Sequence, residues 1–277
     1  MPSNVKADNQ YFGKYFERAL VEHINQTNVI VDPTLYVDTQ GYNFSTKEIE
    51  DLNNDAILVA DYIGHNIHAT RVGDHTASEI GDILLDDGTR IETKRVSSGT
   101  GTYHNTSVYY FTAFNFNFQD YMTKFHLQET IKEYFPNITV SYKNKSPVNA
   151  ASSSTIRHSN NPGYQEILQI DEAMRKTFVM ELIKYFQTHP TEAQIFYKDM
   201  LEKKKINQKN NTMPNRLIAY NYQNKQIHEV NLLTLKDNPS AIIYPTDLGF
   251  CIGNLRIQIG WQNGNGLNNP TIRVFLK

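Results

Sequence analysis

Acidic side chains and one lysine are concentrated in residues 79–96, EIGDILLDDGTRIETKRV, with types and spacing suited to divalent-cation chemistry. Glu92 and Lys94 are two residues apart, so in a strand they project side by side and flank the carbonyl of Thr93. With Asp82 upstream, two carboxylates and a carbonyl form an oxygen-rich half-shell suited to Mg²⁺, for which Mn²⁺ would substitute. Lys94 could hydrogen-bond a water or a phosphate and stabilise negative charge on phosphorus.

A hairpin would bring these groups together. Residues 80–85 and 90–96 are apolar-rich runs on either side of an Asp-Asp-Gly-Thr sequence, whose Asp-Gly chemistry predicts a tight turn between antiparallel strands. Closing the hairpin at this turn places Asp82 near the end of the second strand, within reach of Glu92 and Lys94.

A helix is predicted before the hairpin. Apolar side chains in residues 11–25 recur with a helical period and form one buried stripe. Glu17 falls at the edge of that stripe rather than on the solvated back of the helix. A carboxylate at such a position suggests a functional reason for its burial.

The pattern of Asp82 followed by Glu92-Thr93-Lys94 on a hairpin, after a helix that carries Glu17, resembles the PD-(D/E)XK nuclease superfamily. Its type II restriction endonucleases are the most similar members. By this resemblance Asp82 and Glu92 would bind Mg²⁺ and Lys94 would be the catalytic lysine. Glu17 would match the acidic residue that many members carry on the helix preceding the hairpin.

The resemblance extends over about residues 11–142 and departs from the family pattern at Gly81, where proline is common. Asp82 is the preferred first metal ligand because the turn acids lie at the wrong end of the strand. The alternatives for this ligand are Glu79, Asp86 and Asp87.

The family resemblance implies a Mg²⁺-dependent endodeoxyribonuclease that cuts duplex DNA at a short specific sequence and leaves 5′-phosphates. A symmetric homodimer would cut both strands of a palindromic site, and a cognate DNA methyltransferase would protect the host. One alternative is a structure-specific or repair nuclease on the same core. Another is a non-catalytic DNA-binding protein whose hairpin charges are only a surface pair.

Candidate DNA contacts lie in several segments outside the hairpin. Small polar residues in the loop after the second strand could follow the phosphate backbone, and basic residues further along could add salt-dependent affinity. These candidates are Ser97, Ser98, Thr100, Tyr103, Asn105, Arg157, His158, Lys203, Lys204 and Lys205. Possible base readers near the C-terminus are Arg256, Gln258, Trp261, Gln262 and Asn263.

The order of elements predicts an α/β fold, a central mixed sheet flanked by helices with a restriction-endonuclease-like core and a strand-rich C-terminal region. The core would occupy residues 1–142, and residues 143–277 would provide DNA recognition and dimerisation, unless both form one continuous domain. Further strands are expected at residues 29–37, 57–63, 108–118 and 138–142 and from 216 onward, and helices at 120–135, 171–189 and 191–205.

Composition excludes several classes of protein. Cys251 is the only cysteine among 277 residues, so neither an intramolecular disulfide nor a multi-cysteine zinc site can form. The sequence has no signal-peptide core and no run near the eighteen or so apolar residues that span a bilayer. A prokaryotic cytoplasmic protein without membrane association is expected. The net charge of −2 neither indicates nor excludes nucleic acid as a partner.

Overall fold

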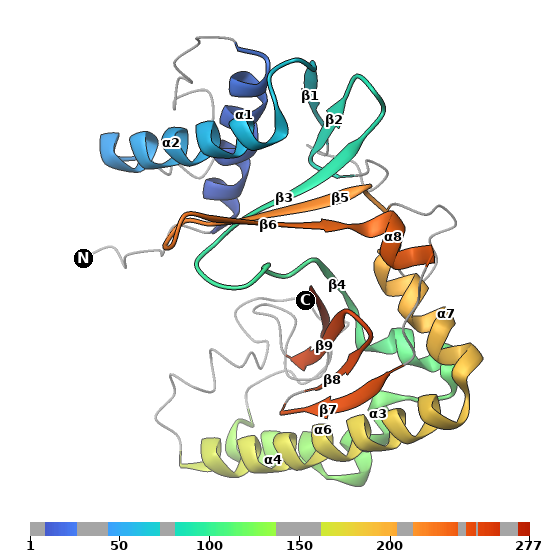
Figure 1. The fold of residues 1–277 in the computed structure, drawn as a ribbon. Coiled ribbons are helices and arrows are strands. Elements are labelled where there is room, and N and C mark those ends of the chain that lie inside the picture. The colour runs from blue at the N-terminus through green and yellow to red at the C-terminus, as the bar shows by residue number, and fades with distance from the viewer. Residues whose placement is uncertain are drawn as a thin grey trace. The chain divides into compact units, whose positions relative to one another are not determined.

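The fold is given by a computed structural model that describes residues 9–26, 44–72, 81–136, 162–203, 213–237, 242–247, 249–260 and 271–277 (Figure 1). The chain forms two compact units that are interleaved in sequence. Unit 1 contains Met1–Gly101 and Thr212–Asp237, and unit 2 contains Thr102–Asn211 and Asn238–Lys277. This division differs from the consecutive domains 1–142 and 143–277 expected from the sequence, because strands after residue 212 return to the first unit.

Unit 1 is a mixed five-stranded sheet with helices, as the predicted α/β class requires. Its sheet has the order β1-β2-β3-β5-β6, in which β3 and β5 are parallel and every other pair is antiparallel. The elements are α1 (Asn9–Ile24), α2 (Thr46–Ile63), β1 (Ala69–Arg71), β2 (Ile83–Leu85), β3 (Arg90–Val96), β5 (Arg216–Asn221), β6 (Gln226–Asn231) and α8 (Leu232–Asp237).

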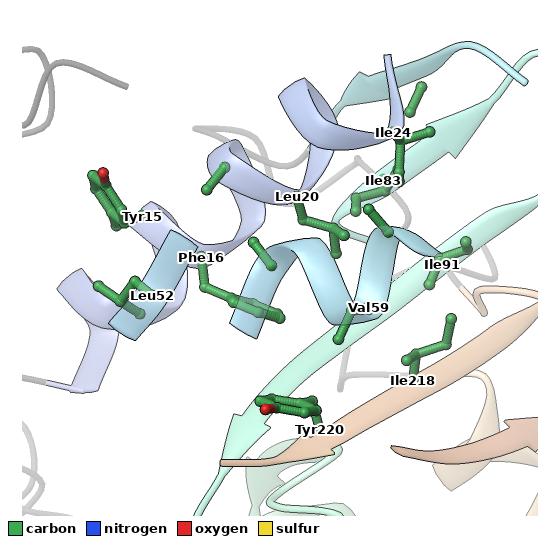
Figure 2. Close-up of a cluster of buried hydrophobic side chains, with 14 of the residues drawn as sticks. Tyr15, Phe16, Leu20, Ile24, Leu52, Val59, Ile83, Ile91, Ile218 and Tyr220 are labelled. Atoms are coloured by element: carbon green, nitrogen blue, oxygen red, sulfur yellow. The ribbon is translucent and has the colours of Figure 1, made fainter. Parts of the chain in front are cut away.

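The core of unit 1 lies between helices α1 and α2 and one face of the sheet. Phe16 on α1 stacks on Tyr220 of β5 at a ring-centroid distance of 6.4 Å, and Ile91 of β3 is completely buried between helix and sheet residues (Figure 2). Each fully buried side chain of this size contributes about 1.5–3 kcal/mol. The predicted amphipathic helix over residues 11–25 is confirmed as α1.

Helix α2 overturns the strand predicted for residues 57–63. A capping box begins the helix: the Ser45 hydroxyl accepts a hydrogen bond from the Glu48 amide, and the Glu48 carboxylate accepts one from the Ser45 amide. The helix then continues to Ile63, burying Leu52, Ala56 and Val59 at helical spacing. A short apolar run has no periodicity that separates a strand from the last turns of a helix.

A buried ion network joins α2 to the sheet. The Asp55 side chain is 1% exposed and forms an ion pair with Arg95 of β3 and with Lys225, both at 2.8 Å. It also accepts a hydrogen bond from the Tyr220 hydroxyl at 2.8 Å. The Arg95 guanidinium lies 4.2 Å from the ring centroid of Tyr222. These partners satisfy the Asp55 carboxylate in the interior.

Unit 2 combines an aromatic helical layer with an antiparallel sheet of order β4-β10-β9-β8-β7. Its helices are η2 (Val108–Phe114), α3 (Phe118–Lys124), α4 (Leu127–Tyr134), α6 (Gly163–Thr188) and α7 (Pro190–Leu201). Its strands are β4 (His104–Ser107), β7 (Ile243–Thr246), β8 (Gly249–Ile252), β9 (Leu255–Gly260) and β10 (Thr271–Leu276). Cys251 is buried in β8.

Two predictions for the region of η2, α3 and α4 were wrong. The aromatic run 108–118 was predicted as a strand but forms the 3₁₀ helix η2, because its aromatic residues pack on α6 and α7 instead of joining a ladder. The helix expected over 120–135 is two helices, separated by His126 at φ 53°. The break between α6 and α7 falls at Pro190, as predicted. The strands predicted at 29–37 and 138–142 lie outside the described residues.

We expect Asp55→Ala to lower the free energy of unfolding by about 3–5 kcal/mol, because it leaves the largely buried Arg95 guanidinium without its carboxylate. Urea denaturation followed by circular dichroism measures the change. Asp61→Ala is the matched control, since Asp61 lies on the same helix and its ion pair with His65, just beyond the helix end, is a surface pair worth under about 1 kcal/mol. Equal losses in the two variants would contradict the assignment.

Candidate active site

The predicted hairpin is confirmed as β2 and β3, although β2 is shorter than expected. The two strands pair with Ile83 opposite Ile91, and the Gly88 amide closes the turn on the Leu85 carbonyl at 2.9 Å. Gly88 has φ +84°, which glycine adopts readily. The Asp82 amide donates to the Ile91 carbonyl at 2.8 Å, so Asp82 lies one residue beyond β2, opposite Glu92.

The end of β2 holds the Asp82 carboxylate against β3. Oδ2 of Asp82 accepts hydrogen bonds from the Thr93 amide at 2.7 Å and from the Thr93 hydroxyl at 3.3 Å. This carboxylate replaces the β2 residue that would otherwise continue the ladder. The side chain is therefore fixed by the backbone of the strand that carries the rest of the site.

Lys94 connects both carboxylates of the proposed site. Its Nζ lies 2.7 Å from Oε1 of Glu92 and 4.0 Å from Oδ2 of Asp82. The side chains of Lys94, Glu92 and Asp82 are 28%, 7% and 19% exposed. Burial by itself would lower the pKa of Lys94, but the Glu92 and Asp82 carboxylates outweigh it and raise that pKa above its ordinary value. Lys94 is therefore charged at neutral pH.

The Thr93 carbonyl faces the same strand edge as Asp82. Carbonyls alternate along a strand: those of Arg90 and Val96 accept from the β5 side, and that of Ile91 accepts from Asp82. Thr93 is two residues from Ile91, so its carbonyl points past the end of β2. The Asp82 carboxylate and this carbonyl therefore share the β2-side edge of β3, and the predicted half-shell stays a prediction.

Glu17 approaches the site from α1. Its Oε2 forms an ion pair with Nη2 of Arg71 at 2.9 Å, and the two side chains are 16% and 12% exposed. Burial raises the pKa of Glu17 to about 7, with a further rise from repulsion by Asp82, while Arg71 and Lys94 oppose the increase. The charges of Asp82 and Lys94 both act on Glu17, which places its carboxyl group near the hairpin.

Arg71 is a residue that sequence reasoning missed. It lies in β1, a strand of three residues whose ATR sequence carries no periodic pattern. Pairing of Arg71 with Ile83 places its guanidinium beside Glu17. This ion pair depends on the packing of α1 against β1, which brings together residues far apart in the sequence.

The alternative first ligands have different positions. Asp86 and Asp87 are exposed in the turn, where Oδ1 of Asp87 accepts a hydrogen bond from the Thr89 amide. Glu79 lies outside the described residues. Gly81 has φ +74°, whereas proline requires a φ near −65°, so the departure from the family pattern matches this backbone conformation.

The donor set is compatible with a cation that takes few protein ligands. No group of three or more histidine, cysteine, aspartate or glutamate side chains in the described parts of the chain could hold a metal. A site of two carboxylates and one carbonyl falls below that number, and Mg²⁺ fills its remaining positions with water and phosphate.

The expected DNA contacts are dispersed. Ser97 and Ser98 are exposed and Thr100 is half-buried in the loop after β3. Tyr103 is buried and donates its hydroxyl to the Leu201 carbonyl at 2.6 Å, so its side chain is not available for DNA. Asn105 is exposed on β4.

The remaining candidates belong to unit 2 or lie outside the described residues. The ammonium group of Lys203 lies 4.9 Å from the ring centroid of Tyr103. Arg256 and Gln258 lie on β9. Those outside the described residues are Arg157, His158, Lys204, Lys205, Trp261, Gln262 and Asn263.

No protein-family model, curated protein or solved structure matches this chain. Within the described residues, no helix combines the length and apolar character needed to cross a lipid bilayer. The site must therefore be interpreted from its own geometry.

The raised pKa of Glu17 predicts a pH-dependent stability. Between its unfolded value near 4.5 and its folded value of about 7, the folded state binds more protons, so stability falls as pH rises through this range. We expect Glu17→Gln to remove about 1–3 kcal/mol of this decline between pH 5 and pH 8. Urea denaturation at several pH values measures the free energy of unfolding, with Glu50→Gln, a change at an exposed residue, as control. If the free energies of the parent and of Glu17→Gln change in parallel with pH, the raised pKa of Glu17 is refuted.

The close approach of Gly81 to the backbone of β3 leads to a second prediction. A Cβ there would lie 2.9 Å from the Ile91 carbonyl oxygen, and the positive φ adds strain. We expect Gly81→Ala to lower the free energy of unfolding by more than the roughly 1–2 kcal/mol that a left-handed conformation alone costs. Gly88→Ala is the matched control, because its Cβ would meet nothing within 4 Å. The two urea-denaturation midpoints should differ, and equal midpoints would show that the close approach does not exist.

Proposed function

We propose that this chain is a Mg²⁺-dependent endodeoxyribonuclease. The observation that carries the proposal is the cluster of buried Glu92 with half-buried Lys94 and Asp82 on the hairpin, in which Lys94 lies within 4.0 Å of both carboxylates. An ordinary ion pair on a strand surface is fully solvated, whereas withdrawing these three charged groups partly from water costs free energy. Perturbed titratable groups gathered at one place are typical of catalytic sites.

Each residue has a definable role in phosphodiester hydrolysis. Asp82, Glu92 and the Thr93 carbonyl would hold the cation, which when bound supplies a Lewis acid for the scissile phosphate and a more acidic water. Lys94 would act as a charged hydrogen-bond donor that stabilises negative charge on phosphorus, since its raised pKa disfavours a role as base. Glu17 would add negative charge near the cation, and Arg71 would keep Glu17 in position.

Within this activity we propose a type II restriction endonuclease that cuts duplex DNA at a short specific sequence and leaves 5′-phosphates. Its support is the resemblance of the hairpin and of Glu17 to that family. A homodimer, a prokaryotic cytoplasm and a cognate methyltransferase follow from the same proposal. A structure-specific or repair nuclease would use the same residues on a different DNA form.

We expect the parent to cut plasmid DNA with Mg²⁺ and not with a chelator. Glu92→Gln and Lys94→Ala should each reduce the cleavage rate on the order of 10²–10⁴-fold. Glu92→Gln removes a ligand of the cation, and Lys94→Ala removes the positive charge that stabilises the negatively charged transition state. The matched controls are Glu50→Gln and Lys47→Ala, exposed residues of α2 with the same charges. They should cut like the parent.

The result that rules out the site is cleavage by Glu92→Gln and Lys94→Ala at the parental rate. If the parent cuts no DNA in Mg²⁺ or Mn²⁺, the nuclease proposal fails and non-catalytic DNA binding gains support. Discrete plasmid fragments indicate a restriction enzyme, whereas cleavage of branched or flapped DNA alone indicates a structure-specific nuclease. Sequencing the cut ends gives the recognised bases.

A further inference from the structure

One face of the unit 2 sheet packs against the hydrophobic core of that unit. Phe250 of β8 contacts Phe196 and Phe186 of the helical layer, at centroid distances of 5.8 and 6.2 Å. Phe250 pairs with Ile257 of β9, which is completely buried. Because side chains alternate along a strand, the neighbours of these residues project from the opposite face, here called the outer face.

Three polar residues form a cross-strand row on the outer face. Arg273 of β10 lies in register with Asn105 of β4 on one side and with Gln258 of β9 on the other. Directly opposed residues in antiparallel strands have Cβ atoms about 4.5–5.5 Å apart, so the three side chains are immediate neighbours. Asn105 is exposed, and Arg273 and Gln258 are half-buried.

A second row places another arginine beside the first. Arg256 of β9 pairs with Phe275 of β10, and its guanidinium carbon lies 4.4 Å from the Phe275 ring centroid. This cation–π contact restrains an exposed arginine. Arg256 and Arg273 are therefore positioned by the ladder and not by a flexible loop.

The outer face carries positive charge without carboxylates on β4, β9 and β10. The outward positions of these strands are Asn105, Ser107, Arg256, Gln258, Gly260, Thr271, Arg273 and Phe275. The exposed or half-buried groups are two guanidinium groups, two amides and the Ser107 hydroxyl, whereas Thr271 is buried and donates its hydroxyl to the Gly260 carbonyl. This face is therefore complementary to a polyanion that also offers hydrogen-bonding groups.

We propose that the outer face of the β4-β10-β9 sheet binds duplex DNA, with Arg256 and Arg273 on phosphates and Asn105 and Gln258 directed to base edges. The proposal deepens the nuclease function and rests on it for the identity of the ligand. Arginine suits phosphate through its planar fork, and asparagine and glutamine suit adenine in the major groove.

Fluorescence anisotropy with a labelled 30-base-pair duplex of random sequence tests the proposal, in chelator so that no DNA is cut. The double variant Arg256→Gln/Arg273→Gln should bind about 10–100-fold more weakly at fixed salt, and its slope of log affinity against log salt should decrease by about 2. Arg256→Lys/Arg273→Lys should keep the slope. Lys184→Ala, an exposed lysine of α6 in the same unit, is the control and should match the parent.

The inference is overturned if the glutamine double variant keeps the parental affinity and salt slope, or if the parent binds no duplex. It is also overturned if polyglutamate displaces the duplex as effectively as unlabelled duplex does, since the face would then accept an acidic protein. Cleavage by the parent separates the two proposals. If the glutamine double variant binds and cuts like the parent, the inference about the outer face is wrong and the nuclease proposal is unaffected. If the double variant binds more weakly but the parent cuts no DNA, the nuclease proposal is wrong and the inference about binding is unaffected.

Discussion

Pairing of strand β3 on both edges is the constraint on which unit 1 depends. The parallel ladder to β5 and the antiparallel ladder to β2 fix the direction of every β3 side chain. Ile91 and Arg95 are directed to the helices, where one fills the core and the other meets Asp55. Glu92 and Lys94, one residue out of phase, are held on the opposite face. The same alternation aims the Thr93 carbonyl past the end of β2 toward Asp82.

Two groups of buried charge in unit 1 differ in their balance. Asp55 is surrounded by Arg95, Lys225 and the Tyr220 hydroxyl, so its carboxylate has ample compensation and the network serves the fold. At the candidate site, three carboxyl groups share Lys94 and Arg71. Burial raises the pKa of Glu17 because the compensation there is incomplete. Under the proposed function, a bound cation would supply it.

The sheet of unit 2 uses the same alternation for another purpose. Its inner residues pack on an aromatic layer around Phe196, and its outer residues are polar and cationic on three adjacent strands. Asn105 and Arg273 are far apart in the chain, and only the pairing of β4 with β10 makes them neighbours. A flat ladder is a rigid support for such groups, which suits recognition better than a loop would.

The sequence by itself determined the local features: the amphipathic helix with Glu17, the capping box at Ser45, the Asp-Gly hairpin and the common face of Glu92 and Lys94. These depend on contacts between residues near in the chain, so short patterns encode them. Tertiary structure alone decided that residues 57–63 and 108–114 are helical, that β5 returns beside β3, and that Arg71 meets Glu17 and Arg273 meets Asn105. Those outcomes depend on packing and strand pairing across long sequence separations, which no local pattern records.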